Sequence, residues 1–415
     1  MGHQHEDEIA HSLVNRSRRC LTWWATLLVV CVGVAACTSF GPSDSPTTEI
    51  GSHRSITASA EQGDSSWPVF ATVPAGQPGL LVPDPDGQAI WWWSPAPNGQ
   101  AQVYRFDTVR HAITTWNLGD AQTLGLEVGE QYGLAVETNG TVWVGANLKL
   151  VELDTTTGLV RVIDVKKPGE ASHPAPPQLA NFSAISALAA DASGNVAVVT
   201  SDTTSIPIYH SSTQSFSYLK LPQGMNADDA SYLPDGALGV AVGDNDGQGG
   251  VLIVTADGGE HYARIGSPSF LVSAGKRFLA GSPPLFWVYP KGNATRGSGS
   301  EASTQWIAYP STRPTWPLAD GDIVSLTHGY DGFQLLSPNG PARQITLPRR
   351  PCGTGPSLSG GGPIIPAEST TRPKPTTTTT PVCYTVVGAM TAIGNTAWYL
   401  EDYDNLTYVW HVPLT

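Results

Sequence analysis

Acidic residues between positions 228 and 247 lie close enough along the chain to suggest a calcium site. They comprise Asp228-Asp229 and the run Asp244-Asn245-Asp246-Gly247. Calcium takes six to eight oxygen ligands, and the EF-hand loop ends in a glutamate that supplies two of them. The run at 244–247 lacks that downstream glutamate. We therefore expect it to form a hairpin loop between two strands.

Histidine and cysteine motifs offer no clear transition-metal site. Downstream of residue 36 the histidines are scattered, and that part of the chain contains no His-x-His, His-Glu-x-x-His or Cys-x-x-Cys motif. Such motifs bring ligands together in the common zinc sites. The sequence therefore predicts no bound metal and no other cofactor.

Nucleophilic catalysis has an equally weak signature. The run Gly297-Ser298-Gly299-Ser300 approaches a Gly-x-Ser-x-Gly motif only loosely, and it lies in a Gly- and Ser-rich loop. A nucleophile elbow needs a sharp strand-to-helix turn. We predict no catalytic residue from these motifs.

Three consecutive tryptophans, Trp91-Trp92-Trp93, could stack on sugar rings. Side chains alternate along a strand, so Trp92 should point away from the face that Trp91 and Trp93 share. Where sheets cover one another on both faces, all three rings become packing residues. We favour packing.

The composition indicates a β-rich fold with many turns. Hydrophobic residues make up 40% of the 415 residues, whereas charged residues make up only 14%, and there are 44 glycines and 34 prolines. That balance argues against long charged helices. The net charge of −13 and the lack of a basic run argue against nucleic-acid binding, which requires cations opposite phosphates.

One unit of about 33 residues recurs along the chain. Between Gly133 and Val165 we expect four short strands, the first two joined by a turn at Asn139-Gly140. Corresponding turn glycines, each followed by a β-type run, occur at Gly87, Gly140, Gly194, Gly236, Gly275, Gly321 and Gly394. Successive glycines lie 53, 54, 42, 39, 46 and 73 residues apart, and the last gap contains an insertion of about 30 residues. This spacing lies near the 40 to 50 residues typical of β-propeller blades.

The ends of the chain bear on the blade count. The last repeat offers only three strands, near 386–391, 396–400 and 407–412, and the segment Trp67–Val73 is a spare strand. Pairing this strand into the last blade would close the ring. We therefore predict an all-β fold, a β-propeller of seven four-stranded blades closed by an N-terminal strand. Six or eight blades, or a pair of β-sandwiches, are the alternatives.

One blade resembles streptogramin-lyase-like and related bacterial sensor propellers. The resemblance rests on Gly140-Thr141-Val142-Trp143-Val144, Leu150-Val151-Glu152-Leu153-Asp154 and Thr157-Gly158. It implies a propeller fold and, for an enzyme, a catalytic histidine with an acidic neighbour. Glu260-His261 is an adjacent pair of that kind in the repeats, but it does not align with the active-site motif of the family. We assign it no role.

The N-terminus carries an export signature. Basic residues Arg16, Arg18 and Arg19 precede an apolar run from Cys20 to Ala36, which ends at Val34-Ala35-Ala36-Cys37. These features define a secretory signal, and the last four residues resemble the bacterial lipobox. That resemblance implies that residues 1–36 are removed and that Cys37 carries acyl chains, palmitate among them, which hold the protein at the membrane. A transmembrane anchor is the alternative. The run Ser17-Arg18-Arg19-Cys20-Leu21 resembles a twin-arginine export motif, and the general export route is the alternative.

Residues 37–65 are rich in Ser, Thr, Gly and Pro and are expected to form a flexible tether, with the propeller at 66–415. A disordered Pro-, Gly- and Thr-rich insertion is expected at about 353–382. Of the mature cysteines other than Cys37, Cys352 and Cys383 form an even pair in an oxidising compartment, so we predict a disulfide between them.

The expected function is therefore that of an extracytoplasmic, lipid-anchored binding or scaffold module of the cell envelope. Its partner would be an envelope protein or a wall glycan, besides the membrane itself. The alternative is an extracytoplasmic lyase or hydrolase that acts on a small molecule. Clustered His, Glu and Asp around the axis would favour the enzyme, whereas Ser, Thr and apolar side chains there would favour the binder.

Overall fold

The structure is a computed structural model. It describes residues 48–51, 53–58, 69–74, 80–95, 98–126, 133–165, 185–200, 205–244, 246–281, 285–296, 315–326, 332–337, 342–347, 350–351, 382–383, 389–403 and 406–414. All the described residues belong to the compact unit Ser45–Thr415.

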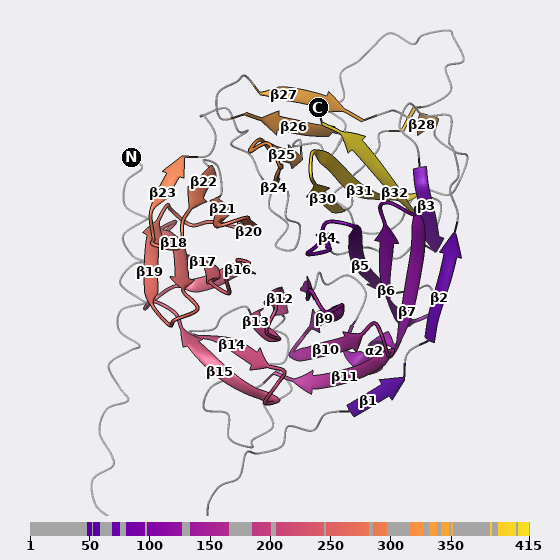
Figure 1. Ribbon diagram of the computed structural model, residues 1–415, viewed down its shortest axis with the longest axis horizontal. Coiled ribbons are helices and arrows are strands. Elements are labelled where there is room, and N and C mark those ends of the chain that lie inside the picture. Colours follow the sequence, from indigo (N-terminus) through magenta and orange to yellow (C-terminus); the bar gives the residue numbers. More distant parts are fainter. Residues whose placement is uncertain are drawn as a thin grey trace, which may run out of the picture. The chain divides into compact units, whose positions relative to one another are not determined.

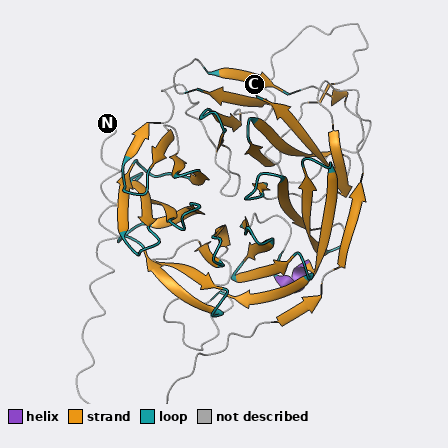
Figure 2. Ribbon diagram, in the orientation of Figure 1, coloured by secondary structure: helices purple, strands orange, loops and turns teal. Residues whose placement is uncertain are grey.

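Seven four-stranded antiparallel sheets surround a common axis as the blades of a β-propeller (Figures 1 and 2). The first three blades are β4 (Val82–Pro83), β5 (Ala89–Pro95), β6 (Gln100–Asp107) and β7 (Ala112–Asp120); β8 (Leu134–Val136), β9 (Thr141–Ala146), β10 (Lys149–Asp154) and β11 (Leu159–Asp164); and β12 (Ile185–Ala190), β13 (Asn195–Thr200), β14 (Ser205–His210) and β15 (Ser215–Lys220). The predicted blade at 133–165 is confirmed as blade 2.

The remaining blades repeat this order from the axis outward. They are β16 (Asn226–Tyr232), β17 (Leu238–Gly243), β18 (Gly249–Val254) and β19 (Glu260–Arg264); β20 (Phe270–Ala274), β21 (Arg277–Gly281), β22 (Leu285–Val288) and β23 (Ala294–Arg296); β24 (Thr315–Pro317), β25 (Ile323–Leu326), β26 (Gly332–Leu336) and β27 (Arg343–Thr346); and β30 (Ala389–Ile393), β31 (Thr396–Tyr403), β32 (Leu406–Pro413) and β3 (Val69–Pro74). The predicted fold of seven four-stranded blades is confirmed.

The first turn of every blade contains a glycine in the left-handed region. The φ angles of the seven predicted turn glycines run from +59° at Gly394 to +92° at Gly321. A side chain with a Cβ rarely adopts this conformation. The glycines therefore fix where each blade reverses, which explains why their spacing revealed the repeat.

The hydrophobic core lies between neighbouring blades. Trp91 and Trp93 pack with Trp116 and residues of blade 2, whereas Trp92 packs with Tyr104 on the side that faces blade 7. All three tryptophans of the run are at most 2% exposed. Because each such ring removes about 150–250 Å² from water, the run holds blade 1 to both of its neighbours. The packing interpretation is confirmed.

The N-terminal strand β3 closes the ring. It pairs with β32, from Val69 opposite Trp410 to Pro74 opposite Leu406. Blade 7 thus combines three strands from the end of the chain with one from its beginning, as the count of strands predicted. The closure leaves no open gap between the first and last blades.

Two further strands precede β3 and lie on the rim of the ring. Strand β1 (Thr48–Gly51) pairs with β11 of blade 2, and β2 (His53–Ala58) pairs with β7 of blade 1. Both fall within residues 37–65, where the composition suggested a flexible tether. The structure gives these ten residues backbone pairing instead. The low hydrophobicity of this segment suggested a tether, but a strand on the outer edge of a blade need not be apolar.

A short two-stranded sheet lies after blade 6. Strand β28 (Arg350–Pro351) pairs with β29 (Val382–Cys383), so residues on either side of the predicted insertion lie next to each other. The residues between these strands, Cys352 among them, lie outside the described part of the chain. The Cys352–Cys383 disulfide stays a prediction.

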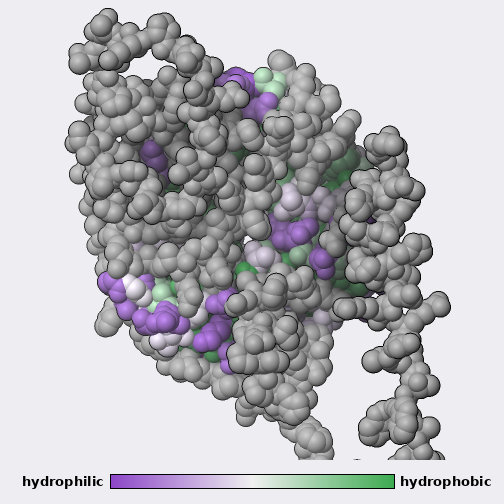
Figure 3. Space-filling view, turned by 180° about the vertical axis from the view of Figure 1, so that it is seen from behind, coloured by the Kyte–Doolittle hydropathy of each residue, from purple (hydrophilic) through white to green (hydrophobic). Residues whose placement is uncertain are grey.

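The helix α2 (Ala121–Leu124) joins blades 1 and 2, with Asp120 accepting a hydrogen bond from the Thr123 amide at its start. Among the described helices, none is long and apolar enough to span a bilayer. Large hydrophobic side chains reach the surface at Val109, Tyr218 and Tyr262. From behind, groups of hydrophilic side chains are visible, with hydrophobic ones mainly in recesses (Figure 3).

Candidate functional site

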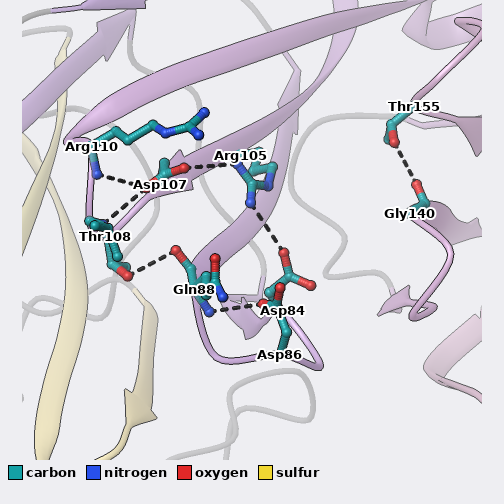
Figure 4. A network of polar contacts seen from close by, with 10 residues as sticks. Asp84, Asp86, Gln88, Arg105, Asp107, Thr108, Arg110, Gly140 and Thr155 are labelled. Atoms are coloured by element: carbon teal, nitrogen blue, oxygen red, sulfur yellow. Dashed lines mark hydrogen bonds and ion pairs between the residues drawn. The ribbon is translucent and has the colours of Figure 1, made fainter.

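Many acidic side chains accept hydrogen bonds from backbone amides in the turns of the blades. In blade 1 the Asp107 carboxylate accepts hydrogen bonds from the backbone amides of Val109 and Arg110, and Arg105 forms ion pairs of 3.5 Å with both Asp84 and Asp107 (Figure 4). Burial raises the pKa of Asp84. At Asp107 burial acts in the same direction, but the two amides and the Arg105 guanidinium together outweigh it and lower the pKa. These carboxylates therefore have structural partners already.

Glu137 is a buried carboxylate at the first turn of blade 2. Its Oε1 accepts a hydrogen bond from Nε1 of Trp143 at 2.6 Å, and its Oε2 accepts one from Nδ2 of Asn139 at 2.8 Å. Burial raises the pKa of Glu137, and the nearby Asp191 raises it further. Both carboxylate oxygens are occupied, so Glu137 holds the β8–β9 hairpin together.

A β-bulge in β16 sets Asp228 apart from its neighbours. Ala227 pairs with Val242 and Asp229 with Ala241, which leaves Asp228 as the extra residue. Bulges re-aim a side chain and are frequent beside functional sites. Asp228 is exposed, whereas Asp229 is buried.

The two adjacent carboxylates have different tasks. Asp229 accepts hydrogen bonds from the amides of Ala230 and Leu271, both at 2.8 Å, and Leu271 belongs to β20 of the next blade. Asp229 thus positions two blades. Although Asp228 is accessible to solvent, the protein around it raises its pKa to about 6, mainly by desolvation and also through the charge of Asp229. Asp228 is therefore reached by solvent, but protein atoms surround much of its carboxylate.

The neighbouring blade repeats the bulge. In β12, Ile185 pairs with Thr200 and Ala187 with Val199, so Ser186 is the extra residue. Both bulges lie at the beginning of adjacent innermost strands, and Asn226 is exposed beside Asp228. We call Ser186, Asn226 and Asp228 the bulge site. Asn226 and Asp228 offer an amide and a carboxylate. The Ser186 hydroxyl donates to the carbonyl oxygen of Val199 at 3.4 Å and can still accept a hydrogen bond. The set suits a polar ligand rich in hydrogen-bonding groups.

The described residues of the seven innermost strands are otherwise small, apolar or hydroxyl-bearing. Their acidic residues are Asp228 and Asp229, and they contain no histidine and no glutamate. Clustered His, Glu and Asp around the axis would favour an enzyme, and Ser, Thr and apolar side chains would favour a binder. The described residues of the inner strands follow the second pattern.

The structure separates most of the residues that the sequence singled out. Asp244 accepts hydrogen bonds from the amides of Asp246 and Gln248, as expected of a hairpin turn. Glu260 and His261 lie exposed on β19, the outermost strand of blade 4, away from the inner strands. Among the described residues no group of three His, Cys, Asp or Glu could hold a metal ion. Cys37 and the run Gly297–Ser300 lie outside the described residues.

From the sequence, Asp228-Asp229 were only part of a calcium candidate, and the bulge site was not predicted. Two adjacent acidic residues in a short strand without other charges were a signal. A bulge is a property of the pairing between β16 and β17, however, and one strand by itself does not reveal it.

No protein-family profile matches the chain, and no curated protein matches it in sequence. Among solved structures, the chain is similar to virginiamycin B lyase from Staphylococcus aureus, with 12% identity, a TM-score of 0.50, and coverage of 87% of this chain and 100% of that one. It is also similar to the Cps50 (Swd1) β-propeller domain of Myceliophteria thermophila (11% identity, TM-score 0.51, 82% and 99% covered) and to the WD40 repeats of RRP9 (11%, 0.52, 86% and 99%). These neighbours include both a lyase and repeat domains. They establish that this chain is a β-propeller.

Proposed function

We propose that this protein is an extracytoplasmic β-propeller, anchored through a lipid on Cys37, that serves as a binding or scaffold module of the cell envelope. The anchor is supported by the apolar run that ends in Val34-Ala35-Ala36-Cys37. The compact unit begins at Ser45, only eight positions after Cys37. Removal of residues 1–36 would therefore leave the propeller complete.

The observation that carries a binding role is the bulge site. Ser186 and Asp228 are the extra residues of two adjacent inner strands, and most of the other described residues of the inner strands are buried. Rigid scaffolds that hold a few polar groups in place are typical of binding sites. The carboxylate suits a ligand with an amine or several hydroxyl groups, which is the chemistry of a wall glycan or of a basic segment of an envelope protein.

One observation favours the rival function, an extracytoplasmic lyase or hydrolase. A pKa of about 6 at Asp228 lies in the range useful to a general base at neutral pH. A lyase or hydrolase also needs an acid or an oxyanion partner for the reacting group. The described inner strands place no histidine or lysine beside Asp228, so binding is the function that we propose.

Fractionation of an exporting bacterial host tests the anchor. The Cys37→Ala variant should move from the membrane to the soluble extracytoplasmic fraction. Cys31→Ala is the matched control, because Cys31 belongs to the apolar run but not to the Val-Ala-Ala-Cys ending, and it should stay in the membrane. Retention of the Cys37→Ala variant would overturn lipid anchoring.

Thermal shift with purified wall-glycan fragments and with basic peptides tests the binding role. A ligand at 100 times its Kd adds about 2.7 kcal/mol, which raises the Tm of a unit of this size by about 3 °C. The rise should disappear in Asp228→Asn and persist in Asp235→Asn, a change at an exposed turn. A Tm rise that survives Asp228→Asn would place the ligand elsewhere, and turnover of the compound would favour the lyase or hydrolase.

A further inference from the structure

Strands β1 and β2 form a belt along the rim of the ring. From its beginning, the chain runs through β1 on blade 2 and β2 on blade 1 to β3 in blade 7 (Figure 1). Four residue pairs join β1 to β11, and six join β2 to β7. The belt thus fixes one entry point of the chain on the ring, at Thr48 opposite Val162.

The entry point limits how far the ring can lie from Cys37. Eleven residue steps separate Cys37 from Thr48. At 3.3–3.6 Å per residue, a fully extended link spans at most about 40 Å, and a flexible one averages about 20 Å. Without the belt, the 28 residue steps from Cys37 to residue 65 would have allowed a fully extended link of about 100 Å, more than twice that length.

We propose that the rim at blades 1 and 2 is the membrane-facing side of the propeller, with a lipid surface as its partner. This inference rests on the proposed lipid anchor at Cys37. The short link between Cys37 and Thr48 reaches the ring at its rim, not at either end of the propeller axis. The rim at blade 2 is therefore held close to the lipid, and the bulge site stays open to partners in the envelope.

Blade 5 provides the contrasting position. It is three blades from blade 2 in one direction and four in the other, and β23 lies across the ring from β1 (Figure 1). Thr295 on β23 and Asp164 at the end of β11 are both exposed. The two residues therefore offer matched labelling sites on opposite parts of the rim.

Energy transfer to a lipid acceptor tests the orientation without relying on natural lipidation. The compact unit Ser45–Thr415 contains every described strand, so residues 38–415 carry the whole fold. A hexahistidine tag in place of Cys37 would bind this chain to vesicles that contain a nickel-chelating lipid and an acceptor-labelled lipid. A bio-orthogonal donor dye would be placed at Asp164 or at Thr295.

Transfer should be stronger from position 164 than from position 295. A 40-residue Gly/Ser insertion between Ser43 and Asp44 should abolish the difference, because the average reach of the link then doubles. Equal transfer from both positions before the insertion, or stronger transfer from 295, would overturn the orientation. Cys37→Ala fractionation reports on the anchor alone, so the failure of one proposal is distinguishable from the failure of the other.

Discussion

The Asp229 carboxylate accepts a hydrogen bond from the backbone amide of Leu271 across the boundary between blades 4 and 5, at 2.8 Å. Its other oxygen accepts one from the Ala230 amide. A second link lies beside it, from the Ser273 amide to Oγ of Ser231. Blades 4 and 5 are thus joined by directional polar contacts near the axis as well as by apolar packing.

We expect Asp229→Ala to destabilise the propeller by about 2–3 kcal/mol, because it leaves two amides without their carboxylate acceptor. The measurement is the Tm of the purified unit. Asp229→Asn retains one acceptor oxygen and should lose less. Asp246→Ala, at an exposed turn, is the control and should change Tm little. Equal Tm values for Asp229→Ala and the wild type would contradict the structural role of Asp229.

Asp228 should make stability depend on pH in the opposite direction to a paired carboxylate. Its pKa is raised from 3.8 to about 6, so the fold favours the protonated form. The stability that this group contributes is full below about pH 4 and is lost as the pH rises through 6. Asp228→Asn should therefore raise Tm at pH 7.5 but not below pH 4.

The expected gain in the free energy of unfolding of Asp228→Asn at pH 7.5 is small, about 1 kcal/mol or less, because solvent screens an exposed carboxylate. Melting curves of Asp228→Asn and the wild type between pH 3.5 and 8 give the comparison. Asp246→Asn, at the same exposed turn, serves as the control. A Tm difference for Asp228→Asn that does not vary with pH would show that the enclosed environment inferred for Asp228 is wrong.

Gly239 makes room for an aromatic ring of the next blade. A Cβ at this position of β17 would lie 2.8 Å from Cε1 and Cζ of Phe278 and 2.9 Å from Cδ2 of Leu271. We expect Gly239→Ala to cost about 1–3 kcal/mol through overpacking between blades 4 and 5. Denaturant unfolding of Gly239→Ala, of Phe278→Leu and of the double variant measures this, since Gly239→Ala should cost less in the Phe278→Leu background. No recovery in the double variant would mean that Phe278 is not the source of the strain.

The belt and the closing strand β3 should contribute differently to the stability and cooperative unfolding of the propeller. Deletion of residues 45–58 removes β1 and β2 but leaves seven four-stranded blades, so we expect a folded unit with a lower Tm. Deletion of residues 45–74 also removes β3 and exposes the edge of β32, so the cooperative transition should be lost. Circular dichroism melting separates the two outcomes. A cooperative transition after the longer deletion would show that the ring does not depend on β3.

The sequence by itself determined the features that depend on neighbouring residues. Turn glycines set a backbone conformation that other residues rarely adopt, so Gly87 and its six counterparts marked the blades without reference to the rest of the chain. Alternation in Trp91-Trp92-Trp93 likewise fixed which rings share a face. The spare strand near Val69 followed from counting strands in a closed ring.

Only the tertiary structure decided the features that depend on pairing between distant residues. Composition cannot show that Thr48 pairs with Val162, because the pairing joins segments more than a hundred residues apart. The bulge that exposes Asp228 exists only in the register between β16 and β17, and the buried role of Asp229 depends on an amide 42 residues away. A strand sequence specifies its two faces, but its partners, register and accessible residues are settled by the packing of the whole ring.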